Sequence, residues 1–436
     1  MMERPVHHHR RKSLIERIRN RGGGIAIIPT SNEAIRNGDV PFSFRPDSNF
    51  HYLTNFNEPE AVLVIVVGES SQCTLFCRDK NIEQEIWEGF HFGPAAAREK
   101  FLLDAAYSIT EFESRLGEMM PGQPAVWYPT GRDPVWDARV SSALSAVRAQ
   151  ARNGQHAPGT IQDVTAELSA MRLIKDDVEI ATMRQAARIS AAAHARAMRV
   201  CRPGLNECEV EAELLHEFRR MGCDAPAYPS IVAGGENTCV LHYAANDKTL
   251  RDGDLLLIDA GGEFQGYASD ITRTFPVNGK FSGPQAEVYT IVLEAQHAAI
   301  ASIEPGADFM TPHLAATRVL AQGMLDLGLL NGSLDGVLES GSYKQFYMHR
   351  TSHWLGRDVH DVGAYKVGND WRLLEAGMVL TVEPGFYIRP AEHVDEKYWN
   401  IGVRIEDDVA VTVTGSDVLS KDAPKQIVEI EALMRG

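Results

Sequence analysis

Hydrophobic and polar residues follow different patterns in the two parts of the chain. The first part carries short, nearly continuous apolar runs at 25–28 and 61–67, which are typical of buried strands. The same pattern continues at 75–76, and helix-like stretches follow at 94–107 and 141–151. This mixture of strands and helices predicts a smaller α/β unit.

The second part has long helical patterns separated by short apolar strands with polar ends. A loop-like passage at 152–160, rich in glycine and proline, precedes a helical stretch at 161–173, and we place the domain boundary near Arg172. Beyond it, apolar residues at helical spacing predict helices at 176–200, 207–221, 285–302 and 312–327. Strands and helices that are mixed in this way predict an α+β domain.

The length of the chain supports this division. A chain of 436 residues is two to three times as long as a usual domain, so we expect two domains with sizeable cores, at 1–172 and 173–436. No chemistry is written clearly in the first domain. Trp87 could serve recognition there, although a tryptophan more often fills a core or an interface.

Composition and charge exclude some classes of partner. The chain has 43 basic and 59 acidic side chains, and its net charge of -16 argues against nucleic acid or an anionic membrane surface as the main partner. The six cysteines form no Cys-x-x-Cys pair, so we expect them to be reduced. Because no apolar stretch has the length of a signal peptide or a membrane span, we expect a cytoplasmic protein.

Two carboxylates that lie eleven residues apart mark the most informative segment. Asp259 follows the aliphatic run 255–258, and Asp270 follows a glycine-rich stretch at 261–266 that predicts a chain reversal. The two carboxylates should then face each other across a hairpin. Burial of an ionised carboxylate is costly unless a positive charge offsets it, and a divalent cation is the natural candidate. The alternative is that each aspartate is a turn or cap residue.

Three later residues extend this pattern. Glu383 ends the apolar run 379–382, Glu406 follows 403–405, and His353 belongs to a cluster of three histidines, His349, His353 and His360. Acids that end several buried strands at one place would repel each other without cations. Oxygen ligands with one imidazole favour Mn²⁺, Co²⁺ or Fe²⁺ over a structural zinc, and four carboxylates are enough to bridge two ions. The pattern predicts a two-metal hydrolase site.

This ordered set resembles the five-ligand signature of the pita-bread metallopeptidases: Asp259, Asp270, His353, Glu383 and Glu406. Segment 52–60 resembles the N-terminal domain of aminopeptidase P and prolidase, and 275–281, 352–363 and 403–408 are similar to bacterial aminopeptidase P. The resemblance covers nearly the whole chain. It implies an Xaa-Pro aminopeptidase, with a pita-bread catalytic domain at 173–436 after an aminopeptidase P-type domain at 1–172. Such enzymes release the N-terminal residue of peptides that have proline in the second position.

The resemblance also implies roles at the metal centre. Asp270, Glu406 and a hydroxide would bridge two ions, with Mn²⁺ favoured and Co²⁺, Zn²⁺ or Fe²⁺ as alternatives. Asp259 would bind one ion and His353 the other, and Glu383 would help to complete the shell. Glu383 would also accept a proton from the attacking water and pass it to the leaving proline nitrogen. His242 and His360 would hydrogen-bond the scissile carbonyl and the developing oxyanion.

Other positions match residues around the substrate in this family. His349 and Arg404 match substrate-side residues, Tyr387 matches a residue near the metals, and Tyr228 matches an active-site tyrosine; each could instead be a packed or salt-bridged residue. Two more residues match positions that shape the substrate cleft of tetrameric relatives, the tryptophan from a neighbouring subunit: Trp87 and Arg152. We therefore expect a homotetramer or a homodimer.

One departure and two alternative functions stand beside this prediction. Close relatives have small or apolar residues where this chain has Arg350 and Thr351, so a bulky cation either lies beside the expected S1′ region or points outward. Prolidase, which cleaves only Xaa-Pro dipeptides, has the same five ligands. A pita-bread domain without metal could be a peptide-binding module, although such proteins usually lack several of the ligands.

Overall fold

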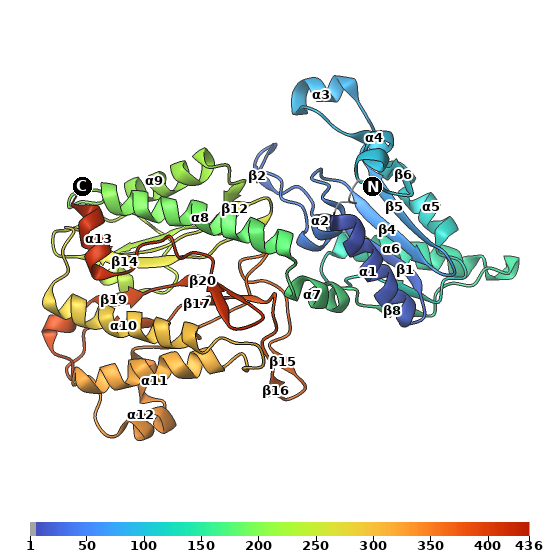
Figure 1. Cartoon of the computed structure of the whole chain (residues 1–436). Helices are drawn as coiled ribbons and strands as arrows, with labels where there is room; N and C mark the ends of the chain where they lie inside the picture. The colour runs from blue at the N-terminus through green and yellow to red at the C-terminus, as the bar shows by residue number, and fades with distance from the viewer. Residues whose placement is uncertain (1–5, 436) are drawn as a thin grey trace. The chain divides into compact units, whose positions relative to one another are not determined.

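The computed structural model describes residues 6–435 and divides into two compact units (Figure 1). The first unit ends at Ser169 and the second begins at Ala170. This division falls inside helix α7 (Thr165–Leu173), which also contains Arg172, the residue nearest the predicted boundary. None of the helices in the described part of the chain combines the length and the apolar character that crossing a membrane requires.

The first unit is built on one mixed six-stranded sheet in the order β6-β5-β4-β1-β7-β8. The pairs β1·β4 and β4·β5 are antiparallel, and the other three pairs are parallel. The sheet strands are β1 (Gly24–Pro29), β4 (Val62–Val67), β5 (Ser71–Cys77), β6 (Ala105–Ser108), β7 (Ala125–Trp127) and β8 (Thr160–Gln162). The small hairpin β2 (Ile35–Asn37) and β3 (Val40–Pro41) and helices α1 (Val6–Asn20), α2 (Ser48–Thr54), α3 (Ile82–Glu88), α4 (Gly93–Lys100), α5 (Phe112–Met119) and α6 (Pro134–Ala149) complete the unit.

The predicted strands of this unit are confirmed, and its helices are confirmed in part. The apolar runs form β1, β4 and the end of β5. The helix predicted at 94–107 is too long, because the chain turns at Leu102, where φ is 52°, and then enters β6. Helix α6 begins before the predicted start, since Asp133 caps it by accepting hydrogen bonds from two backbone N–H groups. Ile161 belongs to β8 and not to a helix.

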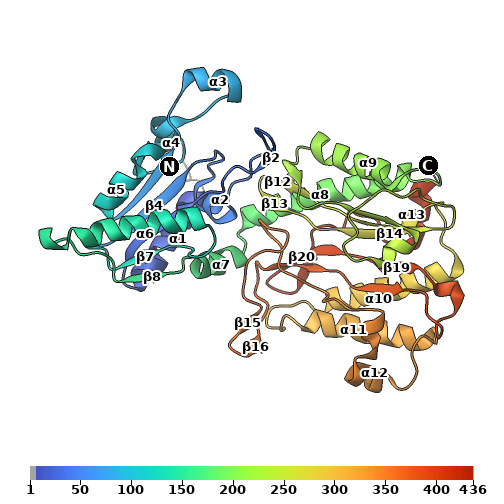
Figure 2. The same ribbon diagram turned by 180° about the vertical axis from the view of Figure 1, so that it is seen from behind.

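In the second unit, strands lie between two pairs of long helices (Figures 1 and 2). One pair is α8 (Asp177–Val200) and α9 (Glu207–Arg220), and the other is α10 (Gly283–Ala301) and α11 (Thr311–Asp326). These are the four predicted helices. Three of them, α8, α9 and α10, begin with a capping box, which at α8 is formed by Asp176 and Glu179. Two shorter helices complete this set: α12 (Leu334–Ser340) and α13 (Ile427–Met434).

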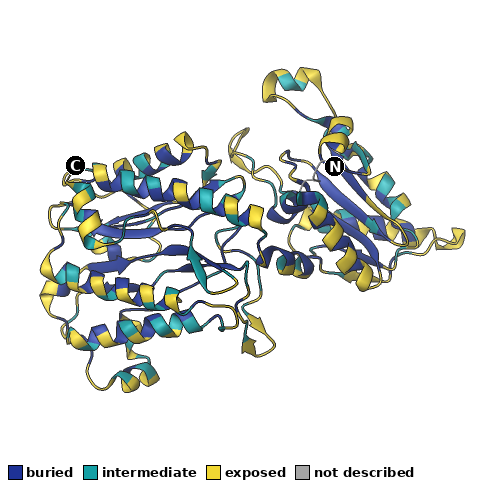
Figure 3. Cartoon of the chain, in the orientation of Figure 1, coloured by how far each residue is buried: buried dark blue, intermediate teal, exposed yellow. Residues whose placement is uncertain are grey.

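The strands of the second unit form short antiparallel sheets, and the predicted ligands lie at or near the ends of these strands. Their orders are β10-β11-β14, β13-β12-β9, β17-β20-β21, β18-β19 and β15-β16. The strands are β9 (Ala225–Pro226), β10 (Ile231–Gly234), β11 (Leu255–Asp259), β12 (Gly262–Phe264), β13 (Tyr267–Ala268), β14 (Thr272–Pro276), β15 (Lys366–Val367), β16 (Asp370–Trp371), β17 (Val379–Val382), β18 (Gly385–Ile388), β19 (Ile401–Arg404), β20 (Asp407–Val411) and β21 (Ser416–Val418). Figure 3 shows that the central strands are buried while the helices expose one face.

Candidate metal centre

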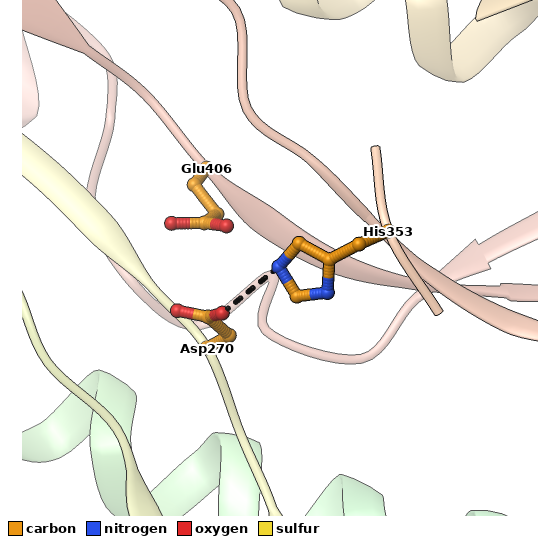
Figure 4. A group of neighbouring side chains, drawn as sticks. All are labelled: Asp270, His353 and Glu406. Carbon is orange, nitrogen blue, oxygen red and sulfur yellow. Dashed lines mark ion pairs between the residues drawn. The ribbon is translucent and has the colours of Figure 1, made fainter. Parts of the chain in front are cut away.

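Asp270, His353 and Glu406 meet at one point of the second unit (Figure 4). One ligand atom from each lies within 4.8 Å of the other two, and His353 Nε2 is 3.3 Å from Asp270 Oδ2. Asp270 precedes β14, and Glu406 lies between β19 and β20. His353 is held beside β17, since its N–H donates to Thr381 Oγ1 at 3.1 Å and its carbonyl accepts from Thr381 N at 3.0 Å.

The other two predicted ligands lie at the edge of this cluster. Tyr228 joins Asp259 to the cluster, because its hydroxyl lies 2.7 Å from Asp259 Oδ1 and 2.5 Å from Asp270 Oδ1 and can donate its one proton to either carboxylate. Glu383 follows β17, and its Oε1 lies 3.7 Å from His353 Nε2. All five predicted ligands line one cleft of about 660 Å³.

The pairing of Asp259 differs in register from the predicted hairpin. Asp259 lies opposite Thr272 in the β11·β14 pair, and Asp270 lies beyond the end of that ladder. The chain makes a second, smaller hairpin, β12·β13, between the two aspartates. Gly261 permits this path: a Cβ at this position would lie 1.8 Å from the carbonyl oxygen of Ser269. The aspartates therefore meet through Tyr228 and not as a cross-strand pair.

The acids of the cluster are buried with little compensating positive charge. Burial, reinforced by repulsion from neighbouring acids, raises the pKa of Glu406 well above its ordinary value and that of Asp270 above its own. Burial raises the pKa of Glu383 to about 7, against the opposing pull of His353 and Arg404. Burial alone would lower the pKa of His353, but Asp270 and Glu383 outweigh it and raise that pKa to about 9. Buried oxygen donors with one imidazole fit one or more divalent cations.

Arg404 is a buried cation whose guanidinium lies beside Asp259. Its guanidinium donates to Asp259 Oδ2 at 2.7 Å, to Thr272 Oγ1 at 3.1 Å and to the Tyr387 hydroxyl at 3.1 Å. Nε2 of His349 lies 2.8 Å from the same hydroxyl. Burial, with help from Arg404, lowers the pKa of His349 to about 4, so this histidine is neutral at physiological pH. The predicted substrate-side residues therefore form one hydrogen-bonded chain.

Thr272 is a functional residue that the sequence reasoning missed. Its side chain is fully buried, and its hydroxyl donates to Glu406 Oε2 at 2.6 Å while it accepts from Arg404 Nε. It therefore fixes the orientation of a predicted ligand. A signal was present, since Thr272 lies two positions after Asp270 and residues at that spacing share one face of an extended chain.

The two predicted non-ligand histidines lie in the cleft lining, outside the three-residue cluster. His360 is exposed, and its ring centroid is 4.5 Å from that of His353 with the rings nearly perpendicular. The protein atoms around the ring still remove part of its solvation, and this desolvation, with repulsion from His353, lowers the pKa of His360. His242 is exposed on the turn that follows Cys239. Apolar side chains that the sequence reasoning did not select also line the cleft: Pro229, Ile231, Leu241 and Val359.

Arg350 and Thr351 point in different directions. Arg350 is exposed in the cleft lining, and its guanidinium lies 5.2 Å from the centre of the Trp371 ring. Thr351 is buried and shares hydrogen bonds with Tyr347 and His313. Arg350 therefore belongs to the cleft lining, while its guanidinium contacts Trp371, which is not among the lining residues; whether this cation affects the expected S1′ region stays a prediction.

Trp87 and Arg152 belong to the first unit. Trp87 is 88% exposed on α3, so the alternative of a core tryptophan is wrong. Three further large apolar side chains are exposed beside it, namely Ile82, Ile86 and Phe90. Arg152 is exposed on the short turn Ala151–Asn153. Their predicted place at a substrate cleft stays a prediction.

Known proteins resemble this chain over almost its entire length. Metallopeptidase family M24 matches residues 181–413, and the aminopeptidase P N-terminal domain matches residues 7–127. The Xaa-Pro aminopeptidase of Escherichia coli (strain K12) is 44% identical over 428 residues, which cover 98% of this chain and 96% of the relative. The solved structure of Pseudomonas aeruginosa aminopeptidase PepP has a TM-score of 0.97 and 47% identity, with 100% of this chain and 99% of that chain covered. Zinc-substituted E. coli aminopeptidase P in complex with product has a TM-score of 0.96 and 43% identity, with 100% and 98% covered.

Proposed function

The chain belongs to metallopeptidase family M24, as an Xaa-Pro aminopeptidase with the pita-bread fold, and we propose that it uses two divalent metal ions to cleave the bond before proline. The observation that carries this proposal is the convergence of Asp270, His353 and Glu406 within 4.8 Å, with Asp259 and Glu383 at the edge of the same cleft. Membership makes the chain a metallo-aminopeptidase that acts on Xaa-Pro peptides. The number and identity of the ions, and the steps below, are the proposal.

Five residues would hold the ions. We propose that Asp270 and Glu406 are shared between them, that Asp259 binds one and His353 the other, and that Glu383 completes the shell. When bound, two divalent ions lower the pKa of a water that they share and so supply a hydroxide nucleophile near neutral pH. Mn²⁺ is favoured because most of the donors are carboxylate oxygens; Co²⁺, Zn²⁺ and Fe²⁺ are the alternatives.

Glu383 would move the proton of the reaction. As a carboxylate it can accept a proton from the attacking water and release it again. The acceptor would be the nitrogen of the leaving proline. Since Glu383 lies 3.7 Å from His353 and 3.8 Å from His349, it stands between the metal cluster and the substrate-side residues.

The remaining residues would bind and orient the peptide. His242 and His360 would donate hydrogen bonds to the scissile carbonyl and stabilise the developing negative charge. His349, Tyr387 and Arg404 would hold the substrate side of the cleft through their hydrogen-bonded chain. Tyr228 would keep Asp259 and Asp270 in place.

We also propose the assembly, the division of labour and the location. The exposed apolar group around Trp87 is suited to a homotetramer or homodimer in which it meets a neighbouring subunit. Arg152 would help to shape the substrate cleft. The N-terminal aminopeptidase P-type domain would be residues 1–172 and the catalytic domain residues 173–436, in a cytoplasmic enzyme.

Arg350 is the observation that keeps prolidase as a second candidate. Arg350 is a residue of the cleft lining, and a guanidinium that turned toward the cleft would pair with the carboxylate of a dipeptide, whose C-terminus follows directly after proline. The test is turnover by Mn²⁺-loaded protein of an Xaa-Pro-Xaa tripeptide against an Xaa-Pro dipeptide. Cleavage of the tripeptide supports our proposal, and cleavage of the dipeptide alone would replace it with prolidase. Absence of both metal and turnover would favour a peptide-binding module.

A further inference from the structure

A buried ion cluster holds the segment that carries His360. Arg172 Nη2 donates to Asp361 Oδ1 at 2.5 Å, and Lys175 Nζ donates to Asp361 Oδ2 at 3.0 Å. The side chains of Lys175 and Asp361 are each 1% exposed. The cleft lining contains His360 but, within the described chain, none of these three residues. The cluster therefore lies directly behind a proposed catalytic histidine without entering the site.

The backbone around Asp361 is fixed at several points. Its N–H donates to the Trp354 carbonyl at 2.9 Å, which closes the loop between the two residues. At the start of this loop, Leu355 N donates to Val379 O at 3.0 Å and so ties it to β17, the strand that Glu383 follows. Gly356 shows how tightly the loop packs, since a Cβ at this position would lie 2.2 Å from Asp361 Oδ2 and 3.0 Å from Lys175 Cε. A larger residue would displace the carboxylate or the loop.

The side chain of His360 is held less firmly than that of Asp361. It is exposed, and its ring makes an edge contact with the ring of His353. An exposed side chain on a loop takes its direction from the backbone, and small displacements of a catalytic group are costly for the rate. The neighbouring residue, Asp361, holds the backbone by two charge-assisted hydrogen bonds from side chains of the opposite sign.

We propose that Asp361, held by Arg172 and Lys175, is a positioning residue that orients His360 toward the scissile carbonyl. This inference rests on the proposed function of His360. Asp361 acts through the backbone and does not touch substrate or metal. Replacement of its carboxylate would remove the anion that two buried cations share, and the loop would relax away from them.

The test compares Asp361→Asn with the parent enzyme, both loaded with Mn²⁺, on an Xaa-Pro-Xaa tripeptide. We expect kcat to fall by about 10- to 100-fold, the range seen when groups that orient active-site residues are removed. KM and metal content should stay close to the parent values. The decisive readout is the double variant: in the His360→Ala background, Asp361→Asn should cause no further loss of kcat.

Asp358→Asn is the matched control. Asp358 shares Arg172 with Asp361, but its side chain is 36% exposed and its removal leaves Asp361 with both cations. This variant should retain the parent kcat. If Asp361→Asn does not fold, Lys175→Met takes its place, because it leaves the Arg172 bond intact; a loss of kcat in the parent background alone is again expected.

The outcomes distinguish the positioning role of Asp361 from the proposed function of His360. An equal loss of kcat in the parent and His360→Ala backgrounds would show that Asp361 acts without His360, and it would overturn the positioning role while the function of His360 stands. Loss of metal from Asp361→Asn would also overturn that role. If His360→Ala itself retains full kcat, the proposed function of His360 is wrong, and the inference falls with it.

Discussion

Glu406 and Asp407 are consecutive residues with 2% and 0% exposure, yet the surroundings of their carboxyl groups differ completely. Asp407 accepts hydrogen bonds from Arg273 at 2.7 Å, Lys425 at 2.7 Å, Ser420 at 2.7 Å and Gln296 at 3.1 Å. Burial alone would raise the pKa of Asp407, but Arg273 and Lys425 outweigh it and lower that pKa. This acid is neutralised entirely by the protein.

Glu406 points toward other acids. Burial and repulsion from Asp270 and Glu383 raise its pKa well above the ordinary value, and it accepts a hydrogen bond from the neutral hydroxyl of Thr272. Two cations thus donate hydrogen bonds to the Asp407 carboxylate, whereas a neutral hydroxyl donates to that of Glu406. This contrast distinguishes an acid kept for structure from one that a metal ion can complete.

The largest expected effect separates the two acids by function. Glu406→Gln should lose metal and reduce Xaa-Pro-Xaa cleavage to background, because it removes a donor proposed to be shared by two ions. The metal-free variant should unfold at the same denaturant concentration as the metal-free parent or at a higher one, since a repelled buried acid is gone. Metal content is measured by elemental analysis and stability by urea unfolding. Full turnover by this variant would contradict the proposed role.

The reverse result is expected for Asp407. Asp407→Asn should lower the free energy of unfolding by about 3–5 kcal/mol, because Arg273 would remain buried without its partner. The fraction that folds should still bind metal. Asp417→Asn is the control: it removes a partly exposed ion pair with Arg184 and should cost at most about 1 kcal/mol. Equal losses in the two variants would remove the distinction between buried and surface pairs.

His194 shows a third way to bury a titratable group and gives a pH test. It is fully buried on α8, its Nε2 lies 3.0 Å from the Ala260 carbonyl, and burial lowers its pKa from 6.5 to about 4. The unfolded chain takes up this proton below pH 6.5 and the folded chain only below about pH 4. Stability from His194 is therefore complete above pH 6.5 and is lost as the pH falls toward 4, by up to about 3 kcal/mol.

The measurement is urea unfolding of the metal-free parent and of His194→Gln between pH 7 and 4. The advantage of the parent over the variant should shrink as the pH falls through this range. An advantage that does not change with pH would mean that His194 is not held neutral by burial.

The smallest effect concerns the hydroxyl that orients Glu406. Thr272→Val should weaken metal affinity by about 10- to 100-fold, because Glu406 loses its hydrogen bond while the shape of the side chain is kept. Thr274→Val is the control on the same strand: its hydroxyl donates to the Arg404 carbonyl and not to a proposed ligand. Titration with Mn²⁺ compares the two, and equal losses would indicate a general effect on β14.

Local patterns in the sequence predicted much of the second unit. Apolar residues at helical spacing predicted α8 to α11, and acids at the ends of apolar runs identified Asp259, Glu383 and Glu406 as members of one site. These signals are local, so they can be read without the fold. The same reasoning failed at 94–107, where a turn at Leu102 separates a helix from a strand that only the sheet explains.

Contacts between residues that lie far apart in the sequence could not be predicted from local patterns. The sequence contains Arg273, Asp407 and Lys425, but nothing in their local patterns pairs Asp407 with Arg273, which is 134 positions away, or with Lys425, which is 18 positions away. The same holds for Arg172 and Asp361 behind His360. The register of Asp259 with Thr272 likewise depends on the small hairpin between the aspartates, and Gly261 before this hairpin is required by its close approach to the Ser269 carbonyl.

The central claim is that divalent cations complete the cluster of Asp270, His353 and Glu406. Calorimetric titration of the metal-stripped protein with Mn²⁺ tests it most directly, with Glu406→Gln and Asp407→Asn titrated in parallel. We predict two ions per chain in the parent, a loss of binding in Glu406→Gln, and two ions per folded chain in Asp407→Asn. A parent chain that binds no Mn²⁺, or a Glu406→Gln variant that binds two ions with the affinity of the parent, would contradict the account.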